Sequence, residues 1–255
     1  MYQTISYQVE AGVAVITLNR PEVMNALSSR MRAEMLAAVL QASAEARVLV
    51  ITGAGRAFCS GQDLGDAGAA IDLEKVLNEE YVPLLKAITD SPIPTISAVQ
   101  GAAAGAGANL ALAADVVIAA ESASFIQAFT RIGLVPDAGG SYWLPRQIGL
   151  ARAMGSVLFA DKVTARQAAD WGMIYECVPD QGFAAHWQAR ARALASGPTL
   201  AYGGVKTALR ASFDNDLDQQ LALEARLQGA CGATEDFREG VAAFLEKRAA
   251  KFRGV

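Results

Sequence analysis

The sequence contains few of the residues that most often bind metals or form disulfide frameworks. Its 255 residues include one histidine, His186, and three cysteines, Cys59, Cys177 and Cys231, with no Cys-x-x-Cys pair. Three widely separated cysteines argue against a disulfide framework and a zinc site, and a single histidine excludes an all-histidine metal centre. Within the helical pattern FAAHWQARARALA, His186 is more typical of a packing or surface residue than of a catalyst. We therefore expect no metal.

Clusters of positive charge and long apolar runs are also missing. The chain has 22 basic and 26 acidic residues, and no Lys/Arg cluster alternates with aromatic residues, so nucleic acid is not an expected partner. Gly, Asn or Asp interrupts the apolar runs before they reach the ~20 residues of a membrane span. The start of the chain, MYQTISYQVEAGVAVITLNR, alternates like a strand and does not have the pattern of a signal peptide. These observations predict a cytoplasmic protein that does not bind a membrane.

Short apolar segments alternate with helical patterns along most of the chain. Four have the composition of strands: VAVITL (13–18), RVLVITG (47–53), PTISAVQG (94–101) and DVVIAA (115–120). Helical patterns lie between them, at 28–46, 72–88 and 107–114. Strands separated by helices, with continuous apolar runs, indicate a parallel sheet that is buried on both faces. The predicted fold class is α/β.

The strand pattern stops at about residue 183, and the remaining sequence is helical. Such a change of composition indicates a second lobe or an arm that packs on a partner subunit. We place the boundary near Pro198, which divides the chain into a core at 1–197 and a C-terminal helical region at 198–255.

Two glycine-rich segments, GAGRAFCSGQDL (53–64) and GAAAGAGANLALAAD (101–115), directly follow predicted strands. Residues without bulk let a ligand approach the backbone, and a helix N-terminus offers free N–H donors to a negative charge. The two segments therefore suit a phosphate or an oxyanion, although small residues also allow close helix packing.

A phosphate site would be part of a dinucleotide-binding turn. Gly101, Gly105 and Gly107 imitate such a turn, and Tyr202 and Lys206 form the YxxxK pattern of a short-chain dehydrogenase. The strict GxGxxG pattern fails, however, and a hundred residues precede the glycines. The competing interpretation is that backbone donors from the two segments hold one carbonyl oxygen and stabilise an enolate.

Several motifs in order identify a family: LNRPEVMNAL (18–27), GRAFCSGQDL (55–64), GAAAGAGANLALAAD (101–115), SFIQAFTRIGLVPDAGG (124–140) and FLEKRAAKF (244–252). On these motifs the sequence resembles the crotonase superfamily of enoyl-CoA hydratases and isomerases over essentially its whole length. The resemblance implies a crotonase-type spiral of ββα units with a helical C-terminal region used in trimer assembly. It also implies an acyl-CoA substrate, no separate cofactor, and a homotrimer or hexamer.

The same resemblance implies an oxyanion hole formed by the backbone N–H groups of Gln62 and Ala106. Met24 and Ala26 would line the CoA moiety, and Lys247 could reach its phosphates, although a solvated helix charge explains Lys247 equally well. The full set of implied substrate contacts comprises Met24, Ala26, Ser60, Gly61, Asp63, Leu64, Gly105, Gly107, Asn109, Phe129 and Lys247.

The departures from the hydratase pattern concern the acids. Hydratases of this superfamily use two glutamates, and the matching positions here hold Asn109 and Phe129, neither of which can act as a general base. Isomerases use one acid at the position of Asp137, within GLVPDAGG. The resemblance thus implies an isomerase with Asp137 as the acid/base, whereas turn chemistry alone explains Asp137 as a loop residue.

An apolar surround would raise the affinity of this acid for its proton. The candidate residues are Phe125, Phe129, Ile132, Leu134 and Trp143. Within the superfamily the sequence is most similar to the ring-epoxide isomerases of phenylacetate breakdown, which implies conversion of ring 1,2-epoxyphenylacetyl-CoA to oxepin-CoA and β,γ to α,β shifts of enoyl-CoA double bonds. Three alternatives stay open: a general enoyl-CoA isomerase or hydratase of fatty-acid oxidation, a nicotinamide-dependent dehydrogenase, and a non-catalytic partner with the same fold.

Overall fold

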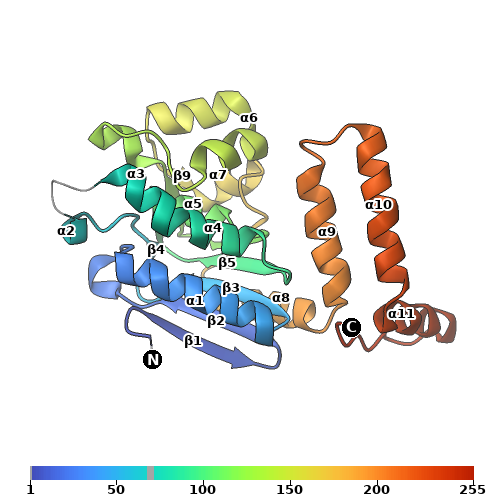
Figure 1. The fold of residues 1–255 in the computed structure, drawn as a ribbon. Helices are drawn as coiled ribbons and strands as arrows, with labels where there is room; N and C mark the ends of the chain where they lie inside the picture. The colour runs from blue at the N-terminus through green and yellow to red at the C-terminus, as the bar shows by residue number, and fades with distance from the viewer. Residues whose placement is uncertain (1, 68–71) are drawn as a thin grey trace.

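The computed structural model describes residues 2–67 and 72–255, and its largest element is a six-stranded sheet (Figure 1). The strands, in their order across the sheet, are β1 (Ile5–Glu10), β2 (Val13–Leu18), β3 (Val48–Gly53), β5 (Thr95–Val99), β7 (Val116–Ala120) and β10 (Glu176–Val178). Only the β1–β2 pair is antiparallel. The four strands predicted from the sequence, β2, β3, β5 and β7, are thus confirmed, and together with β10 they form the parallel part of this sheet.

A second, four-stranded sheet contains the strands that follow the glycine-rich turns. It consists of β4 (Ala57–Cys59), β6 (Ala102–Ala104), β8 (Ser124–Ile126) and β9 (Val163–Thr164), in that order. β4, β6 and β8 are parallel, and β9 is antiparallel to β8. Because β4 and β6 are neighbours, the segments that follow them leave the same edge of the sheet side by side.

Helices cover both sheets. Those of the core are η1 (Pro21–Val23), α1 (Ser29–Glu45), α2 (Leu64–Ala67), α3 (Leu73–Val76), η2 (Leu77–Tyr81), α4 (Val82–Thr89), α5 (Ala106–Leu112), η3 (Ala128–Ile132), α6 (Gly140–Leu158), α7 (Ala165–Asp170) and α8 (Phe183–Ala195). The predicted serine cap of α1 is present, since Ser28 accepts a hydrogen bond from the Met31 N–H. The predicted helix at 72–88 contains a π-helical turn, η2, between α3 and α4.

The parallel sheet is buried on both faces, as its apolar runs predict. Along β3, Leu49 and Ile51 pack into one hydrophobic cluster, whereas Val48 and Val50 pack into another that includes Phe183 of α8. Successive side chains of a strand point to opposite faces, so a strand covered on both sides must be apolar at every position.

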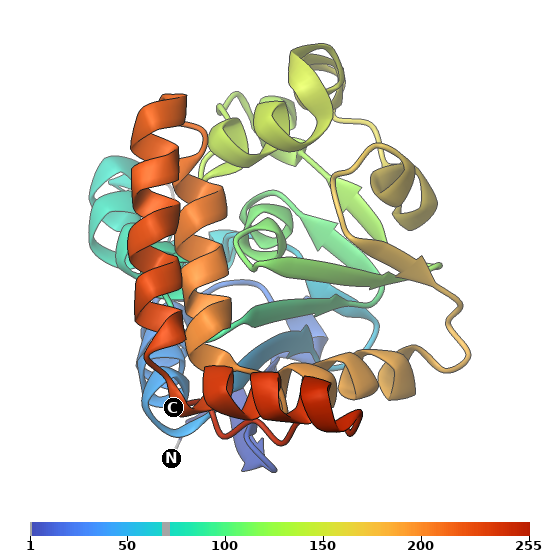
Figure 2. The ribbon, with the colours of Figure 1, turned by 90° about the vertical axis from the view of Figure 1, so that its right-hand side faces the viewer.

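Three helices form an arm beside this core: α9 (Thr199–Ala211), α10 (Leu217–Gly232) and α11 (Glu235–Glu246) (Figures 1 and 2). Lys206 and Arg210 of α9 form ion pairs with Asp115 at 2.8 and 2.7 Å. Large apolar side chains such as Leu209 and Phe244 remain exposed on the arm. Among the described residues, no helix has the length and apolar character needed to cross a membrane.

Candidate active site

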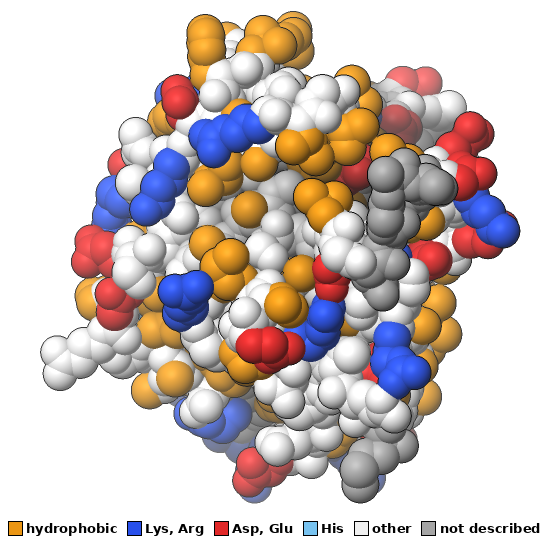
Figure 3. Space-filling view, turned by 90° about the vertical axis from the view of Figure 1, so that its left-hand side faces the viewer, with side chains coloured by type: hydrophobic (Ala, Val, Ile, Leu, Met, Phe, Trp, Pro, Cys, Tyr) orange, Lys and Arg blue, Asp and Glu red, His pale blue; other side chains and the backbone are white. Residues whose placement is uncertain are grey.

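A cavity of about 300 Å³ lies where the two glycine-rich segments meet the turn that contains Asp137. It is on the side of the molecule that carries α2 and α3, where apolar side chains gather at the surface (Figure 3). Its wall is formed by Ser60, Gly61, Gln62, Leu64, Leu73, Val76, Leu77, Tyr81, Gly105, Ala106, Ala128, Phe129, Arg131, Ile132, Leu134 and Asp137. Most of these groups are apolar or backbone, and Asp137 is the one carboxylic acid among the residues described in this wall.

The two glycine-rich segments approach each other so closely that no side chain fits between them. A Cβ added at Gly61 would lie 2.8 Å from the Ala104 carbonyl oxygen and 3.4 Å from the Ala106 nitrogen, and φ of Gly61 is 97°. A Cβ at Gly107 would lie 2.5 Å from the carbonyl oxygen of Cys59. The glycines at these two positions therefore bring the backbones of both segments to one wall of the cavity.

Among the described residues, the hydrogen bonds leave the backbone N–H groups of Gln62 and Ala106 at this wall without an acceptor. Leu27 and Gln62 form a parallel β-bridge, in which the Leu27 N–H donates to the Gly61 carbonyl and the Asp63 N–H donates to the Leu27 carbonyl. The bridge therefore uses the peptide groups on either side of Gln62 and not the Gln62 N–H itself. Ala106 is the first residue of α5, where an N–H has no intrahelical acceptor. Gln62 and Ala106 both line the cavity.

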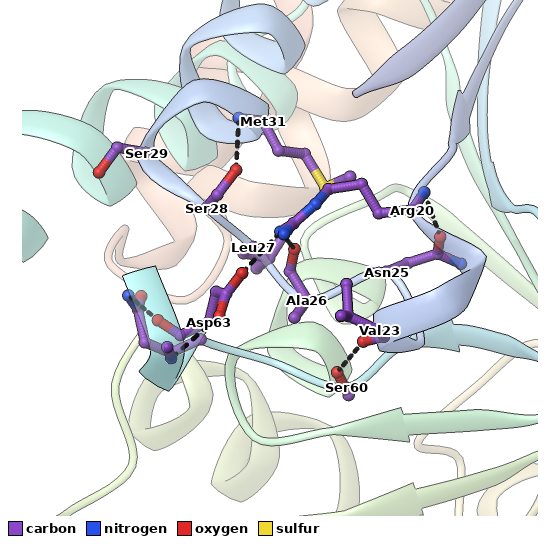
Figure 4. Close-up of polar contacts among 12 residues, drawn as sticks. Arg20, Val23, Asn25, Ala26, Leu27, Ser28, Ser29, Met31, Ser60 and Asp63 are labelled. Atoms are coloured by element: carbon purple, nitrogen blue, oxygen red, sulfur yellow. Dashed lines mark hydrogen bonds and ion pairs between the residues drawn. The ribbon is translucent and has the colours of Figure 1, made fainter. Parts of the chain in front are cut away.

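The loop between β2 and α1 supports this wall from behind (Figure 4). Arg20 Nη1 donates to the Ala26 carbonyl (2.8 Å) and to Asp63 Oδ2 (2.7 Å). The fully buried Asn25 donates to three backbone carbonyls, those of residues 54, 57 and 58. These bonds tie the segment that contains Gln62 to the core without placing a side chain in the cavity.

Cys59 lies at the base of the same segment and does not provide a nucleophile. It is fully buried, its Sγ–H donates to the Asn25 carbonyl (3.1 Å), and burial raises the pKa of the thiol to about 12. At neutral pH the thiolate is not populated.

Asp137 also lines the cavity. Its Oδ1 is buried and has no hydrogen-bond partner among the described residues. Burial raises its pKa from 3.8 to about 6, against a smaller opposing effect of a backbone hydrogen bond. The direction agrees with the apolar surround predicted from the sequence, of which Phe129, Ile132 and Leu134 line the cavity. A carboxylate in this state can take up a proton near neutral pH.

A buried amide, Asn109, holds the backbone of the Asp137 turn. Its Nδ2 donates to the Asp137 carbonyl (2.8 Å), and its Oδ1 accepts from Gln127 Nε2 (2.9 Å). A Cβ added at Gly140 would lie 2.3 Å from Asn109 Nδ2, so the side chain packs closely against the start of α6. Asn109 has no exposed surface and lies behind the cavity wall. This position, which the sequence predicts to contact substrate, holds the turn that presents Asp137.

The structure brings together eight of the predicted site residues at the cavity: Ser60, Gly61, Gln62, Leu64, Gly105, Ala106, Phe129 and Asp137. The others do not line it, namely Met24, Ala26, Asp63, Gly107, Asn109 and Lys247. Lys247 ends α11 on the opposite side of the molecule from α2 (Figure 1). Sequence reasoning missed Leu73, Val76, Leu77, Tyr81 and Arg131, because an apolar helical face that lines a cavity has the same spacing as one that packs in a core.

The residues of the dehydrogenase alternative do not meet at this cavity. Lys206 Nζ donates to the Ile93 carbonyl (2.9 Å) and pairs with Asp115, and neither Tyr202 nor Lys206 lines the cavity. The YxxxK pattern is therefore helix spacing within α9, where Lys206 docks the arm on the core.

Comparisons with known proteins agree on one family. The enoyl-CoA hydratase/isomerase family matches residues 8–255. The chain is 63% identical to a protein of Rhodobacter capsulatus named probable enoyl-CoA hydratase, over 99% of both chains. It is 46% identical to the 1,2-epoxyphenylacetyl-CoA isomerase of Escherichia coli over all of both chains. The crystal structure of an enoyl-CoA hydratase from Bacillus anthracis superposes with a TM-score of 0.92 at 32% identity, covering 99% of this chain and 100% of the other. The protein is a member of the enoyl-CoA hydratase/isomerase family and has the crotonase fold.

Proposed function

We propose that this enzyme is an acyl-CoA isomerase in which Asp137 transfers the proton and the N–H groups of Gln62 and Ala106 hold the thioester oxygen. The observation that carries the proposal is one apolar cavity that is lined by Gln62, Ala106 and the partly buried Asp137, whose Oδ1 has no partner among the described residues. The 46% identity to an epoxyphenylacetyl-CoA isomerase supports the same reaction class.

With a β,γ-enoyl substrate, the reaction begins when ionised Asp137 removes a proton from the carbon next to the thioester carbonyl. The electron pair of the broken C–H bond forms the C=C bond of an enolate, and the negative charge moves to the thioester oxygen, where the two N–H groups stabilise it. Protonated Asp137 then returns the proton to a carbon further along the conjugated system, and the carbonyl reforms. The double bond has moved, no atom is gained or lost, and Asp137 is ionised again.

Water addition, the reaction in the name of the Rhodobacter relative, needs a group that activates water as well as one that delivers the proton. Among the described residues the cavity wall offers one acid, Asp137, while Asn109 is buried behind the wall and Phe129 is apolar. The composition of the cavity thus favours isomerisation over hydration.

For the acyl group we propose ring 1,2-epoxyphenylacetyl, with β,γ-enoyl groups as further substrates. In the ring epoxide, the C–C bond shared by the three- and six-membered rings breaks and its electron pair shifts into the ring double bonds, which gives the seven-membered oxepin. Asp137 then moves a proton from the carbon next to the thioester to a ring carbon, so no atom is gained or lost. The name of the Escherichia coli relative supports the ring epoxide, and the apolar wall formed by Leu73, Val76, Leu77 and Phe129 suits an aromatic ring or a short alkenyl chain. We also propose assembly into a homotrimer or hexamer through the arm, whose apolar side chains are exposed in one chain.

Turnover of a set of CoA thioesters tests the function: ring-epoxide, β,γ-enoyl and α,β-enoyl substrates, each with wild type and Asp137→Asn. We expect isomerisation and solvent-deuterium exchange at the carbon next to the thioester in wild type, and neither in the variant. Hydration of α,β-enoyl-CoA at a rate that matches isomerisation, or exchange retained by Asp137→Asn, would overturn the proposal.

A further inference from the structure

The side chain of Gln62 is held by a buried polar network that the oxyanion hole does not itself require. Gln62 Oε1 accepts hydrogen bonds from Tyr81 Oη (2.6 Å) and Arg32 Nη1 (2.9 Å). Because an amide oxygen has two lone pairs, these two donors saturate it. Gln62, whose backbone N–H the proposed function assigns to the oxyanion hole, is thus fixed through its side chain as well.

Arg32 is the centre of this network and is almost completely buried, with 1% of its side chain exposed. Its Nε and Nη2 both donate to Glu80 Oε2 (2.8 and 2.6 Å), and its Nη1 also donates to the Leu27 carbonyl (2.5 Å). Its guanidinium lies over the Tyr81 ring, 4.7 Å from the centroid. A buried guanidinium with this many partners in a planar fork has one orientation, so the groups that it binds are placed rigidly.

The Leu27 carbonyl connects Arg32 to the backbone around Gln62. It accepts from the Asp63 N–H (3.2 Å), while the Leu27 N–H donates to the Gly61 carbonyl (2.8 Å). Arg32 therefore contacts Gln62 directly and, through Leu27, the peptide groups on both sides of it. A shift of Arg32 would change the direction of the Gln62 N–H.

The other partners of Arg32 come from a π-helical turn in the cavity wall. Glu80 and Tyr81 belong to η2, and Leu77 and Tyr81 of the same turn line the cavity. π-turns inside helices are rare and are frequently found at functional sites. Here the turn allows two consecutive residues, Glu80 and Tyr81, to contact one guanidinium.

We infer that Arg32, Glu80 and Tyr81 are positioning residues that hold the Gln62 backbone N–H in the direction of the thioester oxygen. The inference rests on the proposed function, because it assigns these residues to the oxyanion hole of that reaction. They act through Gln62 and do not touch the reacting atoms. Tyr81 also lines the cavity, so the network connects the wall around the acyl group with the Gln62 N–H that would polarise the thioester carbonyl.

The sharpest test removes the contacts to Gln62 while keeping its backbone N–H. Gln62→Leu deletes the amide acceptor and Tyr81→Phe deletes the hydroxyl donor but keeps the ring. Tyr7→Phe is the matched control, since Tyr7 Oη donates to Glu45 at 2.7 Å on another part of the surface. Circular dichroism and thermal unfolding establish that each variant is folded.

The readout is the red shift of a push–pull enoyl thioester, 4-dimethylaminocinnamoyl-CoA, on binding, together with kcat and KM for isomerisation. Hydrogen bonds to the thioester oxygen polarise the chromophore, so the red shift measures the oxyanion hole, whereas a purely structural role would leave it unchanged. We expect both variants to lose much of the red shift and roughly 10-fold in kcat, with a smaller change in KM, because a misdirected donor costs most in the transition state. Tyr7→Phe should match wild type.

The outcome can be separated from that of the proposed function. The red shift is also measured in Asp137→Asn, where no proton is transferred, so the donor geometry is tested even if the assignment of Asp137 is wrong. A wild-type red shift and kcat in folded Gln62→Leu and Tyr81→Phe would overturn the inference. If wild type does not shift the spectrum of the bound ligand, no oxyanion hole exists and the inference is overturned together with the proposed function.

Discussion

Asp115, which precedes β7, and Asp137, which precedes α6, show how differently one fold treats two partly buried carboxylates. Asp115 Oδ2 accepts from the Thr95 N–H (2.8 Å), the Thr95 hydroxyl (2.9 Å) and Lys206 (2.8 Å), and Oδ1 accepts from Arg210 (2.7 Å). Asp137 Oδ1 has no partner among the described residues. The carboxylate of Asp115 is surrounded by donors and joins the arm to the core. The carboxylate of Asp137 has no such donors at Oδ1 among the described residues, which leaves it available for proton transfer.

The energetic consequences are opposite. Breaking a buried ion pair leaves an uncompensated charge and destabilises a protein, so the partners of Asp115 depend on it. Burial removes water from the ionised Asp137 carboxylate, and Oδ1 gains no hydrogen bond from the described residues in exchange. The raised pKa of Asp137 reflects this desolvation cost of the charged form. Asp137 should therefore be more important for activity than for stability, and Asp115 the reverse.

The largest effect is expected from Asp137→Asn. The variant should lose about 10³-fold or more in kcat, since a general acid/base contributes up to about 10⁴-fold, and it should be more stable than wild type at pH 7 because no charge is buried. Steady-state kinetics and urea unfolding measure the two quantities. Asp161→Asn, at an exposed carboxylate in another loop, is the control. A free energy of unfolding equal to that of wild type would show that burial of the ionised Asp137 carboxylate does not destabilise the protein.

Asp115→Asn should show the opposite pattern. It leaves Lys206, whose side chain is 10% exposed, without its counter-ion, and should reduce the free energy of unfolding by about 3 kcal/mol. Turnover per folded molecule should stay within about twofold of wild type, because Asp115 does not line the cavity. The exposed Glu121–Arg166 pair provides the control variant Glu121→Gln, which should change stability by less than about 1 kcal/mol. A large loss of turnover in folded Asp115→Asn would contradict the division of roles.

Asn109→Ala tests whether the Asp137 turn needs its buried amide. The variant loses the hydrogen bond to the Asp137 carbonyl and leaves Gln127 Nε2 without its acceptor, so we expect a loss of about 1–3 kcal/mol in stability. Displacement of Asp137 should reduce kcat roughly 10-fold, with a smaller change in KM. Asn215→Ala, which removes a surface amide contact in the arm, should leave kcat unchanged. A folded Asn109→Ala with wild-type kcat would show that the turn alone orients Asp137.

The smallest effect concerns pH. The pKa of Asp137 is raised in the folded protein, so the folded state binds more protons than the unfolded state between pH 4 and 6. This contribution to stability is present below about pH 4 and is lost as the pH rises through about 6. The difference in unfolding free energy between wild type and Asp137→Asn should follow that course, and kcat/KM should rise with pH through about 6 as the base ionises. A pH-independent difference would contradict the raised pKa.

The local elements could be predicted because their signals lie within a few residues. Strand composition located β2, β3, β5 and β7, and a serine before an amphipathic run located the start of α1. The glycine-rich segments also predicted close backbone approach, which Gly61 and Gly107 show. The π-turn at η2 was missed, because a single inserted residue barely changes helical periodicity.

The role of a side chain at the site depended on long-range contacts. Asn109 was placed at the substrate by its position in a motif, whereas the tertiary structure buries it against Gly140 and bonds it to the Asp137 turn. The sequence pattern did not single out Arg32, whereas the structure bonds it to Gln62 and Glu80. No local pattern contains these pairings, which join residues tens of positions apart.

The sequence by itself determined the α/β class and the family, and it predicted the oxyanion segments and the acid at Asp137, because these depend on composition, glycine positions and motif order. Only the tertiary structure decided that Asp137 loses water without gaining a partner at Oδ1, while Asp115 gains several. A pKa depends on desolvation and nearby donors, and both are supplied by segments far apart in the chain. The same type of residue is therefore a structural link at Asp115 and, in the proposed function, the proton carrier at Asp137.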